Sequence, residues 1–587
     1  MSIYDKSSLV LIPSGTKTGK VFSQKPVSGD GDFTFTRASA ATRVNASGFI
    51  EKETMNLFRY SEEFNQSPIW FPQANAQISA NAATAPNGTT TADLLYPLVN
   101  NSIVAAIQQI TSVSNVQYTQ SVYVKASGKN FAALYTFNGF TGAAMWVNLT
   151  TGAITNGVGS SVSGRFATSV GNGWWRIGFA DLGNGTTCYM HLYPTEAAGV
   201  NSVTANGTDG ILVWGGQLNY GSVAQDYIKT TTTALYGGIT DNVPRLDYTD
   251  SSCPALLLEP QRSNILTNSE YFAAWIQFNT LNTSNALTSP EGVQNANKLI
   301  AASGVNNNVI YQGLSAGTYT ASIFAKKGEF EGLVMATGTT GAFFNLNTNT
   351  YRNFYASPPT SYNIEDYGNG WHRYSITFTQ GGADNLYIGP NDNVSNSLGV
   401  TGNNSDGIYI YGAQMESASY ATSYIPTYGT SVTRNAEAAY KTGISSLIGG
   451  VEGTIFFDIK TNKTLTSTNY KQFFYYSDSS SAQSYMYISG NNYIVGNPNL
   501  GNIVSGQIIQ ADTRYKIAIT YKENDFKLYI NGSLSATRTS GSVIDAVDIT
   551  SIGSYSGVSE FNEFKFNSYM HFQEVLTNEE LATLTTI

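Results

Sequence analysis

Residues 171–176 read Gly-Asn-Gly-Trp-Trp-Arg, and residues 368–373 read Gly-Asn-Gly-Trp-His-Arg. A Gly-Asn-Gly stretch supplies the positive φ angles of a tight connection between two strands. Side chains alternate between the two faces of a strand, so the Trp and the Arg that follow share one side of the outgoing strand. The two stretches therefore predict the same β-hairpin at two places in the chain.

The hairpin belongs to a longer internal repeat. Three further pairs of segments match in the same order, and the spacing between the partners drifts only slowly. A repeat of this length indicates a duplicated structural module. The matching pairs are 56–64 with 264–272, 118–125 with 319–326, and 209–218 with 406–415.

The composition predicts an all-β protein. Charged residues make up 12% of the chain and aromatic residues 13%, with 56 Gly, 38 Tyr and 29 Phe. Short aromatic and β-branched segments broken by Asn-Gly and Ser-Gly turns are typical of antiparallel sheets. Segments such as 211–214 are apolar on both faces, as in the middle of a sandwich. We expect tandem antiparallel β-sandwiches, of which the two repeated modules are jelly-roll-like.

The last part of the chain follows a different pattern. Residues 515–521 alternate between apolar and polar side chains, and Asn531-Gly532 ends the next strand with a hairpin signal. A short terminal helix is expected after Thr577, with Glu580 at the third helical position. Residues 452–457, 515–532 and 576–581 resemble the concanavalin A-like, laminin G-like fold. The resemblance implies a third sandwich.

The front of the chain resembles a family of tailed-phage virion proteins. The segments that carry this resemblance are 8–15, 31–51, 243–248, 253–262 and 422–427. The family usually has one module, which lies between the last two of these motifs. Here an extra module, residues 56 to about 240, interrupts the usual order. The resemblance implies a fibre or spike component of a virus particle with carbohydrate-binding-like domains.

These patterns divide the chain into five parts. We expect an N-terminal attachment or assembly segment, a first and inserted sandwich module, a linker, a second module and a laminin G-like domain. Their expected bounds are 1–55, 56–235, 236–263, 264–436 and 437–587.

Several classes of partner are disfavoured by the sequence. The net charge of −9 and the lack of a basic run argue against nucleic acid. No apolar run is long enough for membrane insertion, and the N-terminus lacks a signal-peptide pattern. Cys188 and Cys253 cannot form a disulfide framework. We therefore expect a virion protein that is assembled in the host cytoplasm and acts at the host cell surface.

The differing position inside the repeated hairpin is the first candidate for sugar binding. Trp175 in one copy stands where His372 stands in the other, and a variable outward position suits specificity. Trp174 and Trp371 could offer flat rings to a sugar, although a large aromatic that seals the sandwich is the commoner role.

Other candidates are weaker. Tyr485 and Tyr487 share one strand face and could form a binding stripe, or could be ordinary exposed tyrosines. Arg176 and Arg373 could bind a ligand acid, but a structural partner is the commoner role.

No catalytic or metal site is expected. The three histidines, His191, His372 and His571, have neither metal-ligand spacing nor a nucleophile pattern. Laminin G-like domains sometimes hold Ca²⁺ through loop carboxylates, for which Asp458 and Asp478 are available, but solvated loop acids are much commoner. We expect no cofactor.

Three functions remain open. The first is a phage tail fibre or spike, in the form of a homotrimer, that binds host cell-surface glycans and contacts other virion proteins through its N-terminal segment. Repeated weak sites would gain affinity through multivalency. The alternative is a head fibre or tail decoration protein with purely structural contacts. The second alternative is a polysaccharide depolymerase, which would need a pair of carboxylates in a groove.

Overall fold

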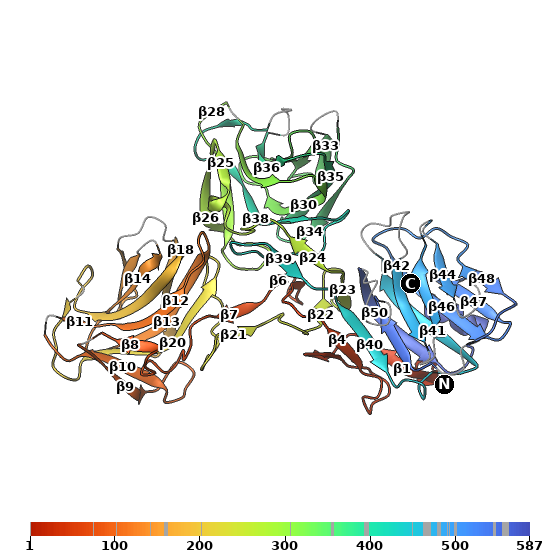
Figure 1. Cartoon of the computed structure of the whole chain (residues 1–587), viewed down its shortest axis with the longest axis horizontal. Coiled ribbons are helices and arrows are strands. Elements are labelled where there is room, and N and C mark those ends of the chain that lie inside the picture. Colours follow the sequence, from red (N-terminus) through yellow and green to blue (C-terminus); the bar gives the residue numbers. More distant parts are fainter. Residues whose placement is uncertain are drawn as a thin grey trace.

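The computed structural model describes most of the chain. The described ranges are 2–73, 75–100, 102–140, 143–157, 163–200, 202–305, 307–353, 357–392, 398–448, 450–461, 471–477, 483–489, 491, 493–497, 502–543, 547–554 and 563–587. They form three β-sandwich lobes around a common centre (Figure 1). This architecture confirms the predicted all-β class of tandem antiparallel sandwiches.

Module 1 is the orange lobe of Figure 1 and consists of two sheets that share the long strand β18 (Trp174–Thr195). Residues 174–182 of β18 pair with one sheet, and residues 187–195 pair with the other. The near sheet, whose β20 contacts β7 at the centre, contains β9 (Ala76–Ala83), β10 (Ala92–Pro97), β20 (Gly210–Tyr220), β13 (Gln117–Ser127), the start of β18 and β17 (Ser163–Gly171). The far sheet contains β8 (Trp70–Pro72), β12 (Ala106–Thr111), the end of β18, β14 (Phe131–Phe140), β15 (Ala144–Asn148) and β16 (Ile154–Asn156).

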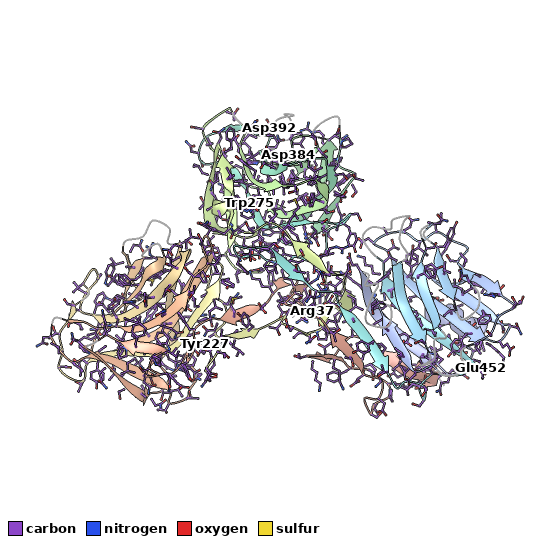
Figure 2. All side chains as sticks on the ribbon, in the orientation of Figure 1. Arg37, Tyr227, Trp275, Asp384, Asp392 and Glu452 are labelled. Carbon is purple, nitrogen blue, oxygen red and sulfur yellow. The ribbon has the colours of Figure 1, made fainter. Side chains whose placement is uncertain are left out.

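Module 2 is the green lobe and repeats this strand order in two separate sheets (Figure 1). Its near sheet contains β26 (Thr280–Leu287), β27 (Ala296–Ala301), β38 (Gly407–Glu416), β30 (Gly317–Lys326), β35 (His372–Gln380) and β34 (Ser361–Asp366). Its far sheet contains β25 (Ile276–Phe278), β29 (Val309–Leu314), β36 (Asp384–Asn391), β31 (Gly332–Ala336), β32 (Gly341–Asn345) and β33 (Thr350–Asn353). Asp384, which starts β36, and Asp392, which follows it, lie in the half of the lobe away from Arg37 at the centre (Figure 2).

The strand register confirms the predicted repeat. Arg176 lies opposite Tyr123 in module 1, and Arg373 lies opposite Phe324 in module 2. Each module also carries a matching two-stranded ribbon and a matching core. The ribbons are β11 (Ser102–Ile103) with β19 (Ser202–Val203), and β28 (Gly304–Val305) with β37 (Thr401–Gly402).

The C-terminal sandwich is the blue lobe (Figure 1). One sheet contains β22 (Arg245–Asp247), β23 (Ala255–Leu258), β50 (Phe564–Phe572), β41 (Glu452–Lys460), β46 (Arg514–Lys522), β47 (Phe526–Ile530) and β48 (Ser533–Arg538), with β1 (Ser7–Leu11) on β50. The other contains β2 (Thr16–Lys17), β3 (Lys20–Val21), β4 (Phe33–Thr36), β40 (Ala438–Thr442), β49 (Ile549–Ile552), β42 (Lys471–Ser477), β43 (Gln483–Ile488), β44 (Ile494–Asn497) and β45 (Ile503–Val504).

Two of the expected segments contribute strands to the C-terminal sandwich. Residues 1–55 are expected to form an attachment or assembly segment, and residues 236–263 a linker. Strands β1, β4 and β23 from these segments belong to the C-terminal sandwich, and Leu9, Phe35 and Leu256 are buried in its core. The physical reason is that β50 would otherwise leave a row of backbone groups unpaired along its outer edge.

The helices are few among the described residues. They are α1 (Ile3–Lys6), the 3₁₀ turn η1 (Phe272–Ala274) and α2 (Asn578–Thr585). The predicted helix start is confirmed, because the Thr577 hydroxyl accepts from the Glu580 amide and the Glu580 carboxylate accepts from the Thr577 amide. The predicted alternation in residues 515–521 is confirmed as well, with Tyr515, Ile517, Ile519 and Tyr521 in the core.

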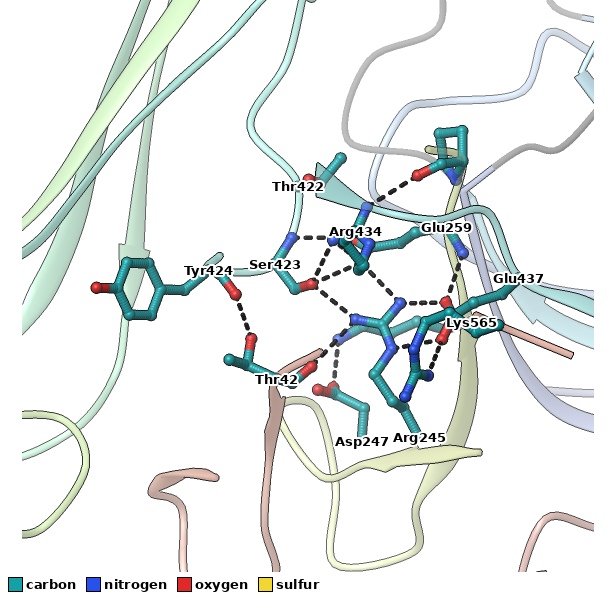
Figure 3. A network of polar contacts seen from close by, with 12 residues as sticks. Thr42, Arg245, Asp247, Glu259, Thr422, Ser423, Tyr424, Arg434, Glu437 and Lys565 are labelled. Carbon is teal, nitrogen blue, oxygen red and sulfur yellow. Dashed lines mark hydrogen bonds and ion pairs between the residues drawn. The ribbon is translucent and has the colours of Figure 1, made fainter. Parts of the chain in front are cut away.

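Three short ribbons and a buried charge cluster join the lobes at the centre. The ribbons are β5 (Arg43–Val44) with β6 (Ile50–Glu51), β7 (Thr54–Asn56) with β21 (Leu235–Gly237), and β24 (Arg262–Asn264) with β39 (Val432–Arg434). The side chain of Arg245 contacts Glu437 at 2.8 Å and Glu259 at 2.8 Å (Figure 3). Arg37 pairs with Glu437 at 2.7 Å, and Arg434 pairs with Glu259 at 2.7 Å. We call these five residues the hub.

Four of the five motifs that carry the virion-family resemblance contribute a residue to the hub or contact it. Arg37, Arg245 and Glu259 lie in three of those motifs, and Ser423 of a fourth accepts a hydrogen bond from Arg245 at 2.7 Å. Although burial alone would raise it, the charges of Arg434 and Arg245 hold the pKa of the Glu259 carboxyl below its usual value. These motifs therefore join module 2 to the C-terminal sandwich.

Candidate functional site

The far sheet of module 1 carries a second apolar face in addition to its core face. Alternate residues are aromatic or imidazole at Tyr135 and Phe137 of β14 and at 189, 191 and 193 of β18, and a strand points such residues to one side. The residues between them, such as Leu134, Met190 and Leu192, are buried in the module core. We call the other side the aromatic face. It consists of Phe71, Tyr135, Phe137, Trp146, Tyr189, His191 and Tyr193.

Strand pairing brings these side chains together across the sheet. Tyr135 lies opposite His191, and Phe137 lies opposite Tyr189. The residue across the sheet from His191 on its other side is Ile107, which in turn lies opposite Phe71. Cross-strand neighbours of this kind are within contact distance on one face. The face therefore spans β8, β12, β18, β14 and β15.

The rings form a connected network. Tyr135 and Phe137 are stacked with centroids 5.6 Å apart and an interplanar angle of 4°. Trp146 meets Tyr135 edge-on at 5.5 Å, and Tyr189 meets His191 edge-on at 6.3 Å. Such contacts hold the rings in fixed orientations. The face is a preformed platform.

Solvent reaches this platform. Phe137 is 39% exposed, and Trp146, Tyr189 and His191 are half-buried. A cluster of aromatic side chains that is open to water is unusual on a stable protein surface unless something binds to it. The exposed edges are therefore the part of module 1 that can contact a ligand.

The imidazole of His191 adds hydrogen-bonding groups without adding charge. Its Nδ1 lies 2.7 Å from the Tyr193 hydroxyl. Burial lowers the pKa of His191 to about 4, so the ring is neutral at pH 7. The aromatic face thus combines flat apolar rings with a neutral polar group.

The far sheet of module 2 presents a related but different surface. Register matches Tyr387 with His191 and Phe343 with Trp146. Ala336 and Gly389 stand where module 1 has Tyr135 and Tyr193, so the surface carries fewer rings. Tyr311 and Tyr387 contact at 5.4 Å, while Phe278 and Ile276 are 51% and 58% exposed. The two far sheets therefore present different side chains.

The predicted tryptophans lie elsewhere. Trp174 is buried with Trp214 beside the near sheet of module 1. Trp371 is buried at the matching place in module 2, where its Nε1 donates to the Thr288 carbonyl at 2.9 Å. Each tryptophan seals its own module. The structure does not bring either of them to the aromatic face.

The variable pair, Trp175 and His372, braces one turn in each module. The Trp175 Nε1 donates to the Leu149 carbonyl at 2.8 Å, and a Cβ added to Gly152 would lie 2.3 Å from the Trp175 ring. In module 2 the matching turn residue is Asn349, whose amide nitrogen lies 2.9 Å from the His372 Nε2. The large Trp175 ring thus packs over a glycine in module 1, and the smaller His372 ring packs beside an asparagine in module 2. This packing gives a structural reason for the difference between the copies.

The two repeated arginines bind within their own modules. Arg176 donates to the Gln225 carbonyl at 2.7 Å, and Arg373 donates to the Thr422 carbonyl at 2.6 Å. Both guanidinium groups also lie over an aromatic ring, at 5.4 Å in each case. These contacts match the structural role that the sequence favoured.

The other candidates fall in the C-terminal sandwich. Tyr487 is half-buried on β43 and points away from the core, which Met486 and Ile488 enter. The side chain of Tyr485 lies outside the described residues. Asp458 forms an ion pair with Arg514 at 2.5 Å, which leaves it poorly placed as a Ca²⁺ ligand, and Asp478 lies outside the described residues. Within the described ranges, no group of three or more His, Cys, Asp or Glu side chains could hold a metal ion.

Sequence reasoning missed the aromatic face, although a signal was present. Residues 189–193 read Tyr-Met-His-Leu-Tyr, and residues 133–137 read Ala-Leu-Tyr-Thr-Phe. Both have period 2 with large side chains on both faces, which predicts a second apolar surface. What the sequence does not give is the pairing of β14 with β18, because that register depends on the fold.

Comparisons with known proteins give partial overlaps with β-sandwich domains. No protein-family model and no curated protein matches the chain. The carbohydrate-binding module (CBM40) of Ruminococcus gnavus IT-sialidase, bound to α2,3 sialyllactose, is 17% identical over 24% of this chain and 84% of its own, with a TM-score of 0.21. Domains LG4–5 of the mouse laminin α1 chain are 11% identical over 46% of this chain and 86% of their own, with a TM-score of 0.16. Among the described residues, no helix has the length and apolarity to cross a membrane.

Proposed function

We propose that this protein is a non-enzymatic binding protein that recognises glycans through the aromatic face of module 1. The observation that carries the proposal is the connected set of partly exposed rings on the far sheet. The C–H groups of a sugar ring form an apolar surface that packs well against a flat aromatic ring. The neutral His191 and the exposed Gln109, which lies opposite Tyr189, can bond the sugar hydroxyls.

The duplicated module supports the same function. Module 2 offers a second far-sheet surface with the half-buried Tyr311 and Tyr387, beside which Phe343 is buried. Two weak sites on one chain, and more on an oligomer, raise the overall affinity for a repetitive glycan through effective concentration. Different residues at matching positions would let the modules prefer different sugars or different linkages.

We also propose, from the family resemblance, that the protein is a homotrimer that forms a fibre or spike of a phage particle. Support comes from the sequence segments that carry the resemblance, which are 8–15, 31–51, 243–248, 253–262 and 422–427. Light scattering of the purified protein tests the trimer, and immuno-electron microscopy of phage particles tests the location. A monomer in solution, or particles without label, would contradict this setting and leave the glycan proposal standing.

The glycan proposal is tested with the full chain on an array of bacterial surface polysaccharides. Binding is expected for at least one, and Tyr189→Ala should weaken it about five- to tenfold, as expected for the loss of one stacking contact. Phe137→Ala should act in the same direction. Tyr362→Ala is the matched control, because Tyr362 is 51% exposed but lies on module 2, outside the aromatic face.

Two other results would count against the proposal. Self-association through the aromatic face, abolished by Tyr189→Ala with no glycan binding in any variant, would favour the purely structural alternative. Release of reducing sugar from a bound polysaccharide would favour the depolymerase.

A further inference from the structure

A separate pocket lies where module 1 meets module 2. Its volume is about 180 Å³, and its walls come from residues 40–41, from β7 and the residue before it, from β20 and β21, and from β39 and the segment before it. Cavities of about 150 Å³ can hold a molecule the size of benzene. The walls are mostly apolar, with Met55 and Ile425 buried in them. The pocket is therefore large enough for a small organic ligand.

Three tyrosines from different parts of the chain line this pocket. Tyr220 ends β20, Tyr236 lies in β21, and Tyr428 precedes β39. The rings of Tyr220 and Tyr428 are stacked with centroids 5.1 Å apart. Tyr236 is 48% exposed and lies opposite Met55 in the β7–β21 ribbon, so it forms the solvent side of the pocket. The pocket thus offers several aromatic rings to one ligand.

One carboxylate, Glu53, shares the pocket with these rings. It is half-buried, and no hydrogen bond or ion pair to it exists among the described residues. Burial, together with the nearby charge of Asp241, raises the pKa of Glu53 to about 7. An acid in such a place is destabilised as an anion unless a positive charge comes to it.

The cations already near the pocket are engaged by other acids. Arg434 is part of the hub, where it pairs with Glu259 at 2.7 Å. Lys52 lies 5.8 Å from the Tyr428 ring and pairs with Glu270 and Glu291. Neither the Lys52 ammonium group nor the Arg434 guanidinium group forms an ion pair with the Glu53 carboxylate.

We propose that this pocket binds a small organic cation of the methylammonium or choline class. Its positive group would lie against the tyrosine rings, with Glu53 as the counter-charge. Aromatic faces attract cations through their quadrupole, and weakly hydrated alkylammonium groups suit a site with few hydrogen-bonding partners. The inference is independent of the glycan proposal, because the pocket and the aromatic face share no residue.

Binding of a cation should be coupled to the ionisation of Glu53. The groups that face it are Asp241, Arg434 and the three tyrosines, with Lys52 behind Tyr428. A cation favours the charged carboxylate, so affinity should rise by up to about tenfold between pH 6 and pH 8.

The test is calorimetric titration of the full chain with choline and with its neutral isostere 3,3-dimethyl-1-butanol. Choline should bind at least about fivefold more tightly than the alcohol. Glu53→Gln should remove that preference, and Tyr236→Leu should weaken choline about fivefold, while Tyr236→Phe retains binding because the ring remains. Glu51→Gln is the matched control, because Glu51 pairs with Arg43 and does not line the pocket.

Three results would overturn the inference. They are equal binding of choline and the alcohol, no binding of either probe, and unchanged choline affinity in Glu53→Gln. The Tyr236→Phe variant guards against misfolding, since it keeps the packing of the pocket.

Discussion

At the scale of single residues, His571 couples the C-terminal sandwich to pH. It is fully buried, with its Nε2 3.1 Å from the Tyr521 hydroxyl, and burial lowers its pKa to about 3. The unfolded chain would have the ordinary histidine pKa of about 6.5. Below that value the unfolded state takes up a proton that the folded state refuses, so stability falls as the pH falls from 6.5 toward 3.

We expect the sandwich to lose about 2 kcal/mol of unfolding free energy between pH 7 and pH 5 through His571 alone. His571→Gln should flatten this dependence by the same amount. All seven tryptophans precede residue 437, so hydrogen exchange of the β41 and β46 amides is the suitable local measurement. Equal slopes for the two proteins would contradict the assignment.

The type of a residue predicted its structural role better than it predicted where the residue lies in the fold. Trp174, Trp371, Arg176 and Arg373 have the structural partners that their types favour. Glu53 could not be found from sequence, because its environment comes from Tyr220, Tyr236 and Tyr428, which distant segments bring together.

At the scale of elements, one turn explains the difference between the repeated hairpins. The turn after β15 has Gly152 at φ +75° beneath Trp175, and the turn after β32 has Asn349 at φ 54° beside His372. Either pair fills the same space, but a mixed pair does not.

We expect Gly152→Asn to destabilise module 1 by about 1–3 kcal/mol, because its side chain would overlap the Trp175 ring. Adding Trp175→His should recover part of the loss, since His372 and Asn349 coexist in module 2. Denaturant unfolding of the wild type, both single variants and the double variant measures the coupling. Additive effects would show that the turn and the ring are independent.

Elements themselves were largely predictable. The period-2 pattern of residues 515–521 and the capping pair Thr577 and Glu580 are local signals, and both appear in the structure. The partners of a strand are not local. Nothing in residues 7–11 states that they pair with residues 569–572 at the other end of the chain.

At the scale of the whole molecule, the hub holds module 2 and the C-terminal sandwich together. Arg245 starts β22 of the C-terminal sandwich and bonds Ser423, which follows β38 in module 2. Glu437 forms ion pairs with Arg245 and with Arg37, which belongs to the N-terminal part of the chain. The five-part division read from sequence could not contain this feature, because each segment contributes only one or two of its charges.

Removing Arg245 leaves Glu259 and Glu437 buried with half of their positive partners. We expect Arg245→Met to cost about 3–5 kcal/mol in unfolding free energy, because a buried charge without its partner is far more costly than an intact pair. Module 2 and the C-terminal sandwich should also separate, which small-angle X-ray scattering would register as a larger radius of gyration.

Arg43→Met provides the control, since Arg43 and Glu51 form a partly exposed pair and such pairs contribute about 0–1 kcal/mol. Arg245→Lys should give an intermediate loss, because an ammonium group keeps the charge but cannot bond both carboxylates in the planar geometry of a guanidinium group. If Arg245→Met had the same scattering curve and the same stability as Arg43→Met, the lobes would be held by the backbone ribbons and apolar contacts of the centre, and the hub would be a consequence of their arrangement instead of its cause.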